Sequence, residues 1–254
     1  FFQNEPAEIG ARPYGAPADE PIRFLQGNES AKVRSTVFLK QAQKTPSFWN
    51  LIGIHFWGCA GHNMILIFLV AIAEAGEVGL SRGMAVAVYI TLTVVSTLTR
   101  FGVPIAADRA GSKGVMGVSF AMQTFPLLLL ILAVSMASLP LFFVFAILFG
   151  IGMGGEMSAF LVINRQYYGM GPVRTIFGFQ NLGSGVGMAV GGLLGGVIFD
   201  LFGSYDIAWI ISIATSLGGA AFILLLEPTS RLLMPDWEDA LPVEARTPAP
   251  VASG

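Results

Sequence analysis

Charge is what this sequence has least of. Only 12% of its 254 residues are charged, whereas 54% are hydrophobic and the mean hydropathy is +0.69. Soluble domains carry about 25% charged residues, so the composition excludes an ordinary soluble protein and indicates a membrane protein. The few charges are also unevenly placed, because residues 47–226 hold twelve of them and the two ends hold eighteen. We therefore expect the ends in water and the middle in lipid.

Other scarce features exclude several classes of function. The single cysteine, Cys59, excludes an internal disulfide framework. The net charge of −2 provides no basic surface for nucleic acid. There is no phosphate-binding loop, HExxH or CxxC motif, and residues 182–185, Leu-Gly-Ser-Gly, lack the first glycine of the Gly-x-Ser-Gly motif of intramembrane serine proteases. We predict that the protein is not an enzyme and binds no cofactor.

The two ends of the sequence are predicted to be hydrophilic segments in the cytoplasm. Residues 1–46 are rich in proline and have no sustained apolar periodicity, which is typical of a solvated linker, with a short interfacial helix near 31–43. Because the chain starts without methionine and inside this linker, we expect the polypeptide to extend upstream. Residues 228–254 are predicted to form a disordered tail.

Six hydrophobic segments lie between these ends, each near the ~20 residues that cross a hydrocarbon core of ~30 Å. Since lipid offers the backbone no hydrogen bonds, each segment is predicted to be a helix. Pro126 is expected to kink the third. The predicted fold class is therefore an all-α membrane protein with a six-helix bundle over 47–227. Its spans are 48–73, 83–106, 114–135, 139–164, 175–200 and 206–226.

Lysine and arginine residues predict the orientation. Twelve of them fall on one side of such a bundle, and only Arg82 falls on the other. By the positive-inside rule, both ends of this chain are expected in the cytoplasm, with the bundle in the inner (plasma) membrane.

The fifth span carries glycine at every fourth position, which leaves one helix face without side chains. This spacing predicts close helix packing of the GxxxG kind. A surface that slides during a conformational change is the functional alternative, and both can hold together. The glycines are Gly183, Gly187, Gly191 and Gly195.

Two charged residues are predicted to lie inside the membrane. Arg100 and Glu156 are eight and nine residues from the charged ends of their spans, which is about 12 and 13 Å of helix, so they can share a depth. Inserting a charge at that depth costs about 2.5 to 3.5 kcal/mol. Charged residues therefore occur there when they are paired with another group, hydrated or part of a functional site. One interpretation is a structural ion pair. The other is that Arg100 meets an anionic substrate and Glu156 exchanges protons.

Three polar residues on the first span form a further candidate group. His55 and His62 are seven residues apart on one helical face, and Asn63 follows. One ion cannot bridge histidines at this spacing and no carboxylate or thiol completes a site, so we predict no metal. The residues are expected to line a water-filled cavity, or else to pack between helices.

A polar hairpin between the second and third spans carries a resemblance. Residues 108–113, Asp-Arg-Ala-Gly-Ser-Lys, resemble the Gly-x-x-x-Asp-Arg-x-Gly-x-Lys/Arg signature of the major facilitator superfamily, with Pro104 in place of its first glycine. Later blocks resemble the tenth to twelfth helices of bacterial carriers related to monocarboxylate porters and oxalate/formate antiporters. They are 150–156 (GIGMGGE), 164–169 (NRQYYG), 177–178 (FG), 191–195 (GGLLG), 199–200 (FD) and 203–206 (GSYD). Residues 6–15 resemble the linker between the halves of such carriers.

The resemblance implies that this chain is the second half of a twelve-helix carrier and needs an N-terminal six-helix half as its partner. By matching position, Asp108, Arg109 and Lys113 would belong to the cytoplasmic gate, with Arg165 as a partner for Asp108, or else they anchor the topology. Arg100 matches the carboxylate-binding position. The implied function is secondary transport of a small organic anion across the lipid bilayer. The alternatives are efflux of hydrophobic compounds or a six-span oligomeric scaffold or channel subunit.

Overall fold

The computed structural model describes residue 10 and residues 29–75, 78–169 and 171–246. Within these ranges the chain forms eight α-helices, two short 3-10 helices and no strand. The predicted linker before residue 29, apart from residue 10, and the last eight residues of the tail lie outside the described ranges. The α-helices are α1 (Glu29–Ala42), α2 (Pro46–Glu74), α3 (Arg82–Ala110), α4 (Ser112–Thr124), α5 (Pro126–Ser135), α6 (Leu139–Tyr168), α7 (Val173–Phe202) and α8 (Asp206–Leu224).

Six helical segments are long and apolar enough to cross a membrane, and they coincide with the six predicted spans. The predicted fold class is therefore confirmed. The third span consists of two helices, because α4 ends at Thr124 and α5 begins at Pro126. Proline has no backbone N–H to continue the helical ladder and clashes with the preceding turn, so the predicted kink at Pro126 occurs as a break between helices.

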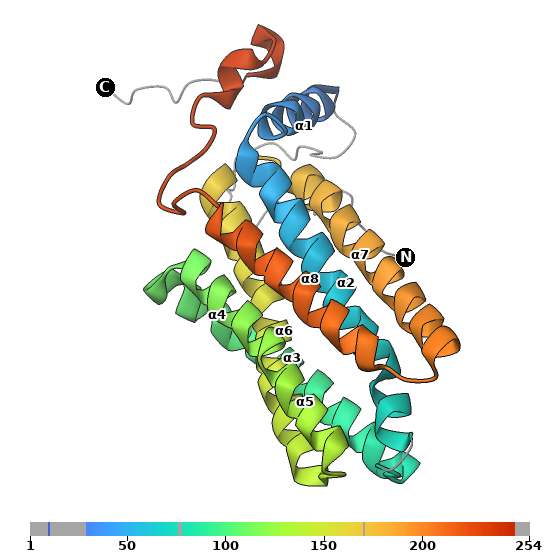
Figure 1. The fold of residues 1–254 in the computed structure, drawn as a ribbon. Coiled ribbons are helices and arrows are strands. Elements are labelled where there is room, and N and C mark those ends of the chain that lie inside the picture. The colour runs from blue at the N-terminus through green and yellow to red at the C-terminus, as the bar shows by residue number, and fades with distance from the viewer. Residues whose placement is uncertain (1–9, 11–28, 76–77, 170, 247–254) are drawn as a thin grey trace. The chain divides into compact units, whose positions relative to one another are not determined.

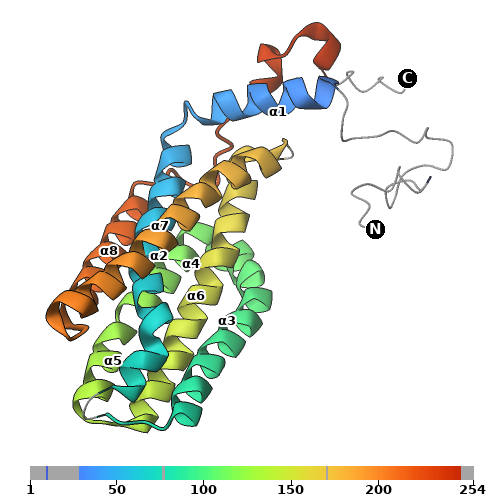
Figure 2. The same ribbon diagram turned by 90° about the vertical axis from the view of Figure 1, so that its right-hand side faces the viewer.

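The bundle consists of two groups of three spans (Figures 1 and 2). In one group, α2 packs against both α7 and α8, which hardly touch each other. In the other, α6 packs against α3 and against the broken span α4 and α5. The helices α2 and α6 are thus the central members, and half of the most apolar window of each is buried, against 17% for α3 and 22% for α7.

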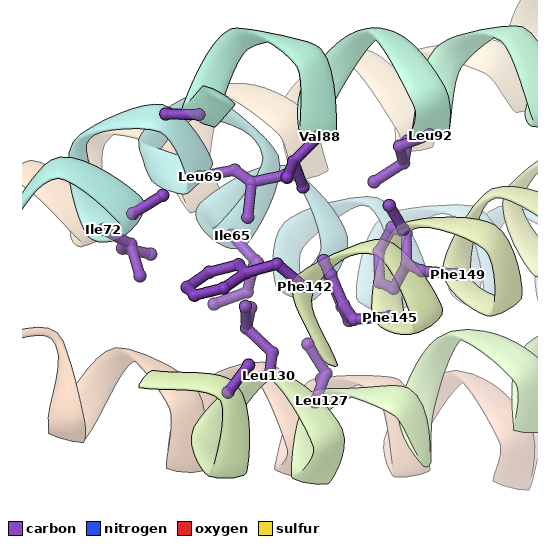
Figure 3. Packing of buried hydrophobic residues seen from close by; sticks show 14 of the residues in the cluster. Ile65, Leu69, Ile72, Val88, Leu92, Leu127, Leu130, Phe142, Phe145 and Phe149 are labelled. Carbon is purple, nitrogen blue, oxygen red and sulfur yellow. The ribbon is translucent and has the colours of Figure 1, made fainter. Parts of the chain in front are cut away.

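An apolar core joins the two groups at the end of the bundle where α3 begins and α2 ends (Figure 3). Its side chains come from α2, α3, α5 and α6 and, through Trp209, from α8, and they pack around three phenylalanines of α6. Between helices in lipid, close packing replaces the hydrophobic effect as the main attraction, so this filled region fixes the spans at one end. The labelled members are Ile65, Leu69, Ile72, Val88, Leu92, Leu127, Leu130, Phe142, Phe145 and Phe149.

The glycine face of α7 lies directly on the backbone of α2. A Cβ atom added to Gly183, Gly187 or Gly191 would lie between 2.1 and 2.7 Å from a carbonyl oxygen of α2, which is closer than any real contact. A Cβ on Gly195 would meet the Phe68 ring instead. We call this contact the α2/α7 seam. The three carbonyls belong to Ile52, Phe56 and Ala60, so the spacing of four residues is the same on both helices.

A second contact of the same kind joins α6 to α3. Cβ atoms added to Gly150 and Gly154 would lie 2.6 and 2.2 Å from the carbonyl oxygens of Leu92 and Ser96. We call this contact the α3/α6 seam. On its other side, α6 uses Gly152 and Gly155 to approach α4. Without these glycines, α6 could not be the centre of its group.

The described ends of the chain form a separate unit of their own. In it, α1, which corresponds to the helix predicted near 31–43, packs against the 3-10 helices η2 (Trp237–Ala240) and η3 (Val243–Ala245). Arg34 forms an ion pair with Glu238, donates to the Ala245 carbonyl at 2.9 Å and lies 4.9 Å from the centre of the Trp237 ring. The tail that we expected to be disordered over 228–254 therefore includes two ordered turns.

Candidate functional site

A cavity of about 160 Å³ lies inside the bundle, between the two groups of helices. Residues of five spans line it, so no single helix builds the site. Its apolar wall consists of Leu66 and three methionines, Met153, Met157 and Met188. Its polar members are Cys59, His62 and Asn63 of α2, Arg100 of α3, Gln123 of α4, Glu156 of α6 and Ser184 of α7.

Glu156 is the centre of the polar group and is only 3% exposed. Its Oε2 atom accepts a hydrogen bond from Gln123 Nε2 at 2.9 Å and lies 3.7 Å from Nδ1 of His62. Three spans therefore meet at one carboxyl group. The position is accessible to these neighbours because Gly155 lets α4 approach α6 and Gly58 removes side-chain bulk beside Oε1.

Several polar atoms of this group have no hydrogen-bond partner within the described part of the chain. They are Glu156 Oε1, Gln123 Oε1 and His62 Nε2, and all are buried. A buried polar atom without a partner is unfavourable by about 1 to 3 kcal/mol. Such atoms beside a cavity indicate a place where another polar group binds.

Arg100 lies at the boundary between this cavity and a larger groove. The groove has a volume of about 540 Å³, runs between α3 and α6 towards the Asp108 end, and is lined by Arg100, Pro104, Asp108, Arg165 and neighbouring residues of α6. Arg100 and Met157 line both spaces. Arg100 thus lines one space together with Glu156 and the other together with Asp108, and its side chain forms no ion pair with a described residue.

The predicted gate residues do not form one cluster. Asp108 and Arg165 line the same groove, but no ion pair joins these two side chains. Arg109 is exposed at the end of α3. Lys113 instead donates to the carbonyl oxygens of Leu224 and Leu226 at 3.1 and 2.6 Å, which satisfies the last turn of α8.

The two histidines of α2 have different surroundings. His62 and Asn63 line the cavity, and Asn63 also donates to the Met188 carbonyl of α7 at 2.8 Å. His55 is fully buried two turns away, stacked on Phe160 with ring centres 3.7 Å apart, and it does not line the cavity. No group of three or more potential metal ligands occurs among the described residues.

Two residues that contact the site were not among the predicted site residues. Gln123 is a polar residue within a span, which is a weak signal by itself, and nothing in its local pattern shows that it faces Glu156. Ser158 of α6 donates to the Arg100 carbonyl oxygen at 3.3 Å. A signal for Ser158 did exist, because it continues the four-residue spacing of Gly150 and Gly154.

The comparison with protein families agrees with this architecture. The family model for the Major Facilitator Superfamily matches residues 51–250, which is most of the chain. The chain belongs to the Major Facilitator Superfamily. A comparison with curated proteins found no match. Members of this superfamily are membrane transporters, so the six-span bundle is a multi-pass transport protein that moves some small substrate.

Proposed function

We propose that this superfamily member carries a small organic anion of the monocarboxylate kind, couples the movement to a proton, and works by alternating access. The observation that carries the proposal is that Arg100 and Glu156, from two different apolar spans, line the same cavity. Arginine is always charged and its planar fork of donors matches a carboxylate. The methionine wall would contact the short hydrocarbon part of such an anion.

Glu156 is the group that takes and releases the proton in this proposal. Its carboxyl group has one oxygen held by Gln123 and the other without a partner among the described residues, so either a proton or a cation can be accommodated there. In the proposed cycle, the Arg100 side chain moves to pair with Glu156 when no anion is bound, because the two groups form no ion pair in the arrangement described above. When the anion binds, it competes for the guanidinium, and Glu156 becomes protonated because a buried carboxylate without a partner is unfavourable.

A second six-helix half completes the carrier. Arg100 is exposed on α3, and most of the α3 surface is not covered by this chain. An arginine at this depth is unfavourable against lipid by about 2.5 to 3.5 kcal/mol, so another protein surface or a water-filled path must cover it. The site of such carriers lies between two bundles that rock against each other. We therefore expect the isolated chain not to transport.

The Asp108 end of the bundle faces the cytoplasm in this proposal, as do both ends of the chain. Asp108, Arg109 and Lys113 then form one side of the inner gate, with Arg165 across the groove from Asp108. The rocking of the two halves opens and closes this groove. The membrane would be the plasma membrane, where lysine and arginine accumulate on the cytoplasmic side.

Uptake by the complete gene product in proteoliposomes tests the proposal. A panel of labelled monocarboxylates and dicarboxylates is offered with and without a proton gradient. We expect Arg100→Ala to abolish uptake, while Arg82→Ala, at the exposed start of the same helix, keeps it. Glu156→Gln should remove the dependence on the proton gradient, and Glu74→Gln at the end of α2 should preserve it. Unchanged uptake with Arg100→Ala would exclude its role as the anion anchor.

Efflux of hydrophobic compounds is the second candidate, and the apolar lining of the cavity favours it. Leu66 and the three methionines form a flexible surface that accepts varied shapes. The same proteoliposomes distinguish the two functions, because an apolar dye should be transported independently of Arg100. Dye movement with no carboxylate uptake would favour the efflux carrier.

A further inference from the structure

The α3/α6 seam ends at a position where the backbone of α3 is incomplete. Pro104 lies inside α3, which is helical from Arg82 to Ala110. In an α-helix the N–H of residue 104 would donate to the carbonyl oxygen of residue 100, and proline has no N–H. The carbonyl group that loses its partner therefore belongs to Arg100.

Ser158 supplies the missing donor from the neighbouring helix. Its hydroxyl group donates to the Arg100 carbonyl oxygen at 3.3 Å, and residue Ser158 is 6% exposed. A serine in a helix can satisfy its own hydroxyl group on the carbonyl of the preceding turn, as Thr97 and Thr99 do on α3. Ser158 instead bonds across the seam, to the one carbonyl that proline leaves open.

The register of the seam explains why this residue meets that carbonyl. Gly150 faces Leu92 and Gly154 faces Ser96, so four more residues along both helices bring position 158 to position 100. The first two positions must be glycine, because a Cβ would collide with a carbonyl oxygen. At the third position a side chain fits, and the hydroxyl group is the part of it that reaches the carbonyl.

We propose that Ser158 is a positioning residue for Arg100. The hydroxyl group replaces the N–H that Pro104 lacks, and it holds the turn of α3 from which the Arg100 side chain reaches the boundary between cavity and groove. Proline at position 104 leaves this turn free to bend, so the orientation of Arg100 depends on a bond to another helix. The transport consequence rests on the proposed function, in which Arg100 holds the anion.

The single cysteine of the chain gives a readout that does not depend on the substrate. Cys59 lines the same cavity as Arg100. Cys59 is labelled with an anionic and with a cationic methanethiosulfonate of similar size. The ratio of the two labelling rates reports the positive charge of the nearby Arg100 guanidinium. Mass spectrometry of the Cys59 peptide measures both rates in the complete gene product. Arg100→Ala should bring the ratio close to one, which shows that the assay detects Arg100.

A double-mutant cycle then tests the positioning role. Ser158→Ala should lower the anionic preference by about three- to tenfold, the range expected for interhelical hydrogen bonds in membranes. Ser158→Thr keeps a hydroxyl group and should retain the preference. In the Pro104→Ala background the new N–H bonds to Arg100, so adding Ser158→Ala should change the ratio less than about twofold. The proposal would be overturned if Ser158→Ala changed the labelling ratio equally with proline and with alanine at position 104. It would also be overturned if Ser158→Ala changed the ratio in neither background.

Carboxylate uptake separates this proposal from the proposed function. If both hold, Ser158→Ala raises KM for the carboxylate by the same factor that it changes the labelling ratio, and kcat changes less. If the labelling ratio changes as the double-mutant cycle predicts while KM for the carboxylate is unchanged, Ser158 positions Arg100 but Arg100 does not anchor the anion. If KM rises while the ratio stays constant, Ser158 acts by another route and the positioning proposal is wrong.

Discussion

The α2/α7 and α3/α6 seams have the same four-residue glycine spacing. Only the α3/α6 seam also faces a carbonyl group that has lost its hydrogen bond within the helix. In the α2/α7 seam, three successive glycines face three successive carbonyl groups, and no proline interrupts either helix at the contact. In the α3/α6 seam, two glycines are followed by Ser158, opposite the carbonyl that Pro104 leaves without its helical donor. In the first seam the hydrogen bonds between the helices involve side chains beside the glycine positions, such as Asn63, whereas the second ends in a hydrogen bond at the next position of the glycine spacing, beside the candidate site.

This difference shows how one bundle can combine a contact without side chains and an adjustable contact. In the α2/α7 seam the two backbones pack directly on each other, an arrangement that fits both close packing and a surface that slides. The α3/α6 seam has a flexible proline turn at its end, held by one hydroxyl group. The charged residue of the cavity, Arg100, is on the adjustable helix, while Glu156 is on the central one.

Gly191→Ala in the α2/α7 seam should have the largest effect. Its Cβ would lie 2.1 Å from the Ala60 carbonyl oxygen, and neither backbone can move without separating the helices. We expect the free energy of unfolding to fall by about 3 kcal/mol, at the upper end for overpacking. Denaturation of the purified protein in mixed micelles measures the change.

Gly185→Ala is the matched control, because it lies on the same helix and a Cβ there meets nothing within 4 Å. Alanine is the better helix former by about 1 kcal/mol, so this variant should be as stable as the parent or slightly more stable. Equal destabilisation by the two substitutions would show that the seam is not the reason.

Gly154→Ala in the α3/α6 seam should destabilise less, by about 2 kcal/mol, since α3 contains Pro104 and can bend away from α6 at that turn. The bend moves Arg100 relative to Glu156, so carboxylate uptake per folded protein should fall more than with Gly191→Ala. Gly117→Ala on α4, where a Cβ is in open space, is the control. If Gly154→Ala and Gly191→Ala lower uptake in the same proportion to their loss of stability, the two seams do not differ in function.

Asn63→Ala should have the smallest effect. Its side chain adds one hydrogen bond to a seam that glycine packing already holds, through the Met188 carbonyl at 2.8 Å. Interhelical hydrogen bonds in membranes contribute about 0.6 kcal/mol on average, and we expect that loss in the same micelle assay. Thr97→Ala, whose hydroxyl group bonds only within α3, should change less still. A larger effect for Asn63→Ala than for Gly191→Ala would reverse the proposed order of importance.

The spans were predictable because lipid leaves the backbone few choices. A run of about 20 apolar residues must be a helix there, and Pro126 cannot continue one. The depth of a residue within its span could also be predicted by counting residues from the charged end of the helix, since each residue adds 1.5 Å of rise. Counting from the charged ends put Arg100 and Glu156 at similar depths, and both line one cavity.

What counting cannot provide is the rotation of each helix and the pairing between helices. His55 and His62 share a face of α2, yet only His62 reaches the cavity, because Phe160 of α6 covers His55. Lys113 belongs to the signature hairpin, yet it bonds to the last turn of α8. Gln123 contacts Glu156 only because glycine lets α4 approach α6. Each outcome depends on contacts between residues far apart in sequence.

The unit at the chain ends has a consequence for the order of synthesis. Arg34 and its partner Glu238 are 204 residues apart, and the whole bundle is encoded between them. At about 5 to 20 residues per second on the ribosome, α1 is made roughly 10 to 40 s before the segment with Trp237 that covers it. The contact between Arg34, Trp237 and Glu238 therefore forms only after the last span has been translated, and it distinguishes a finished chain from a truncated one.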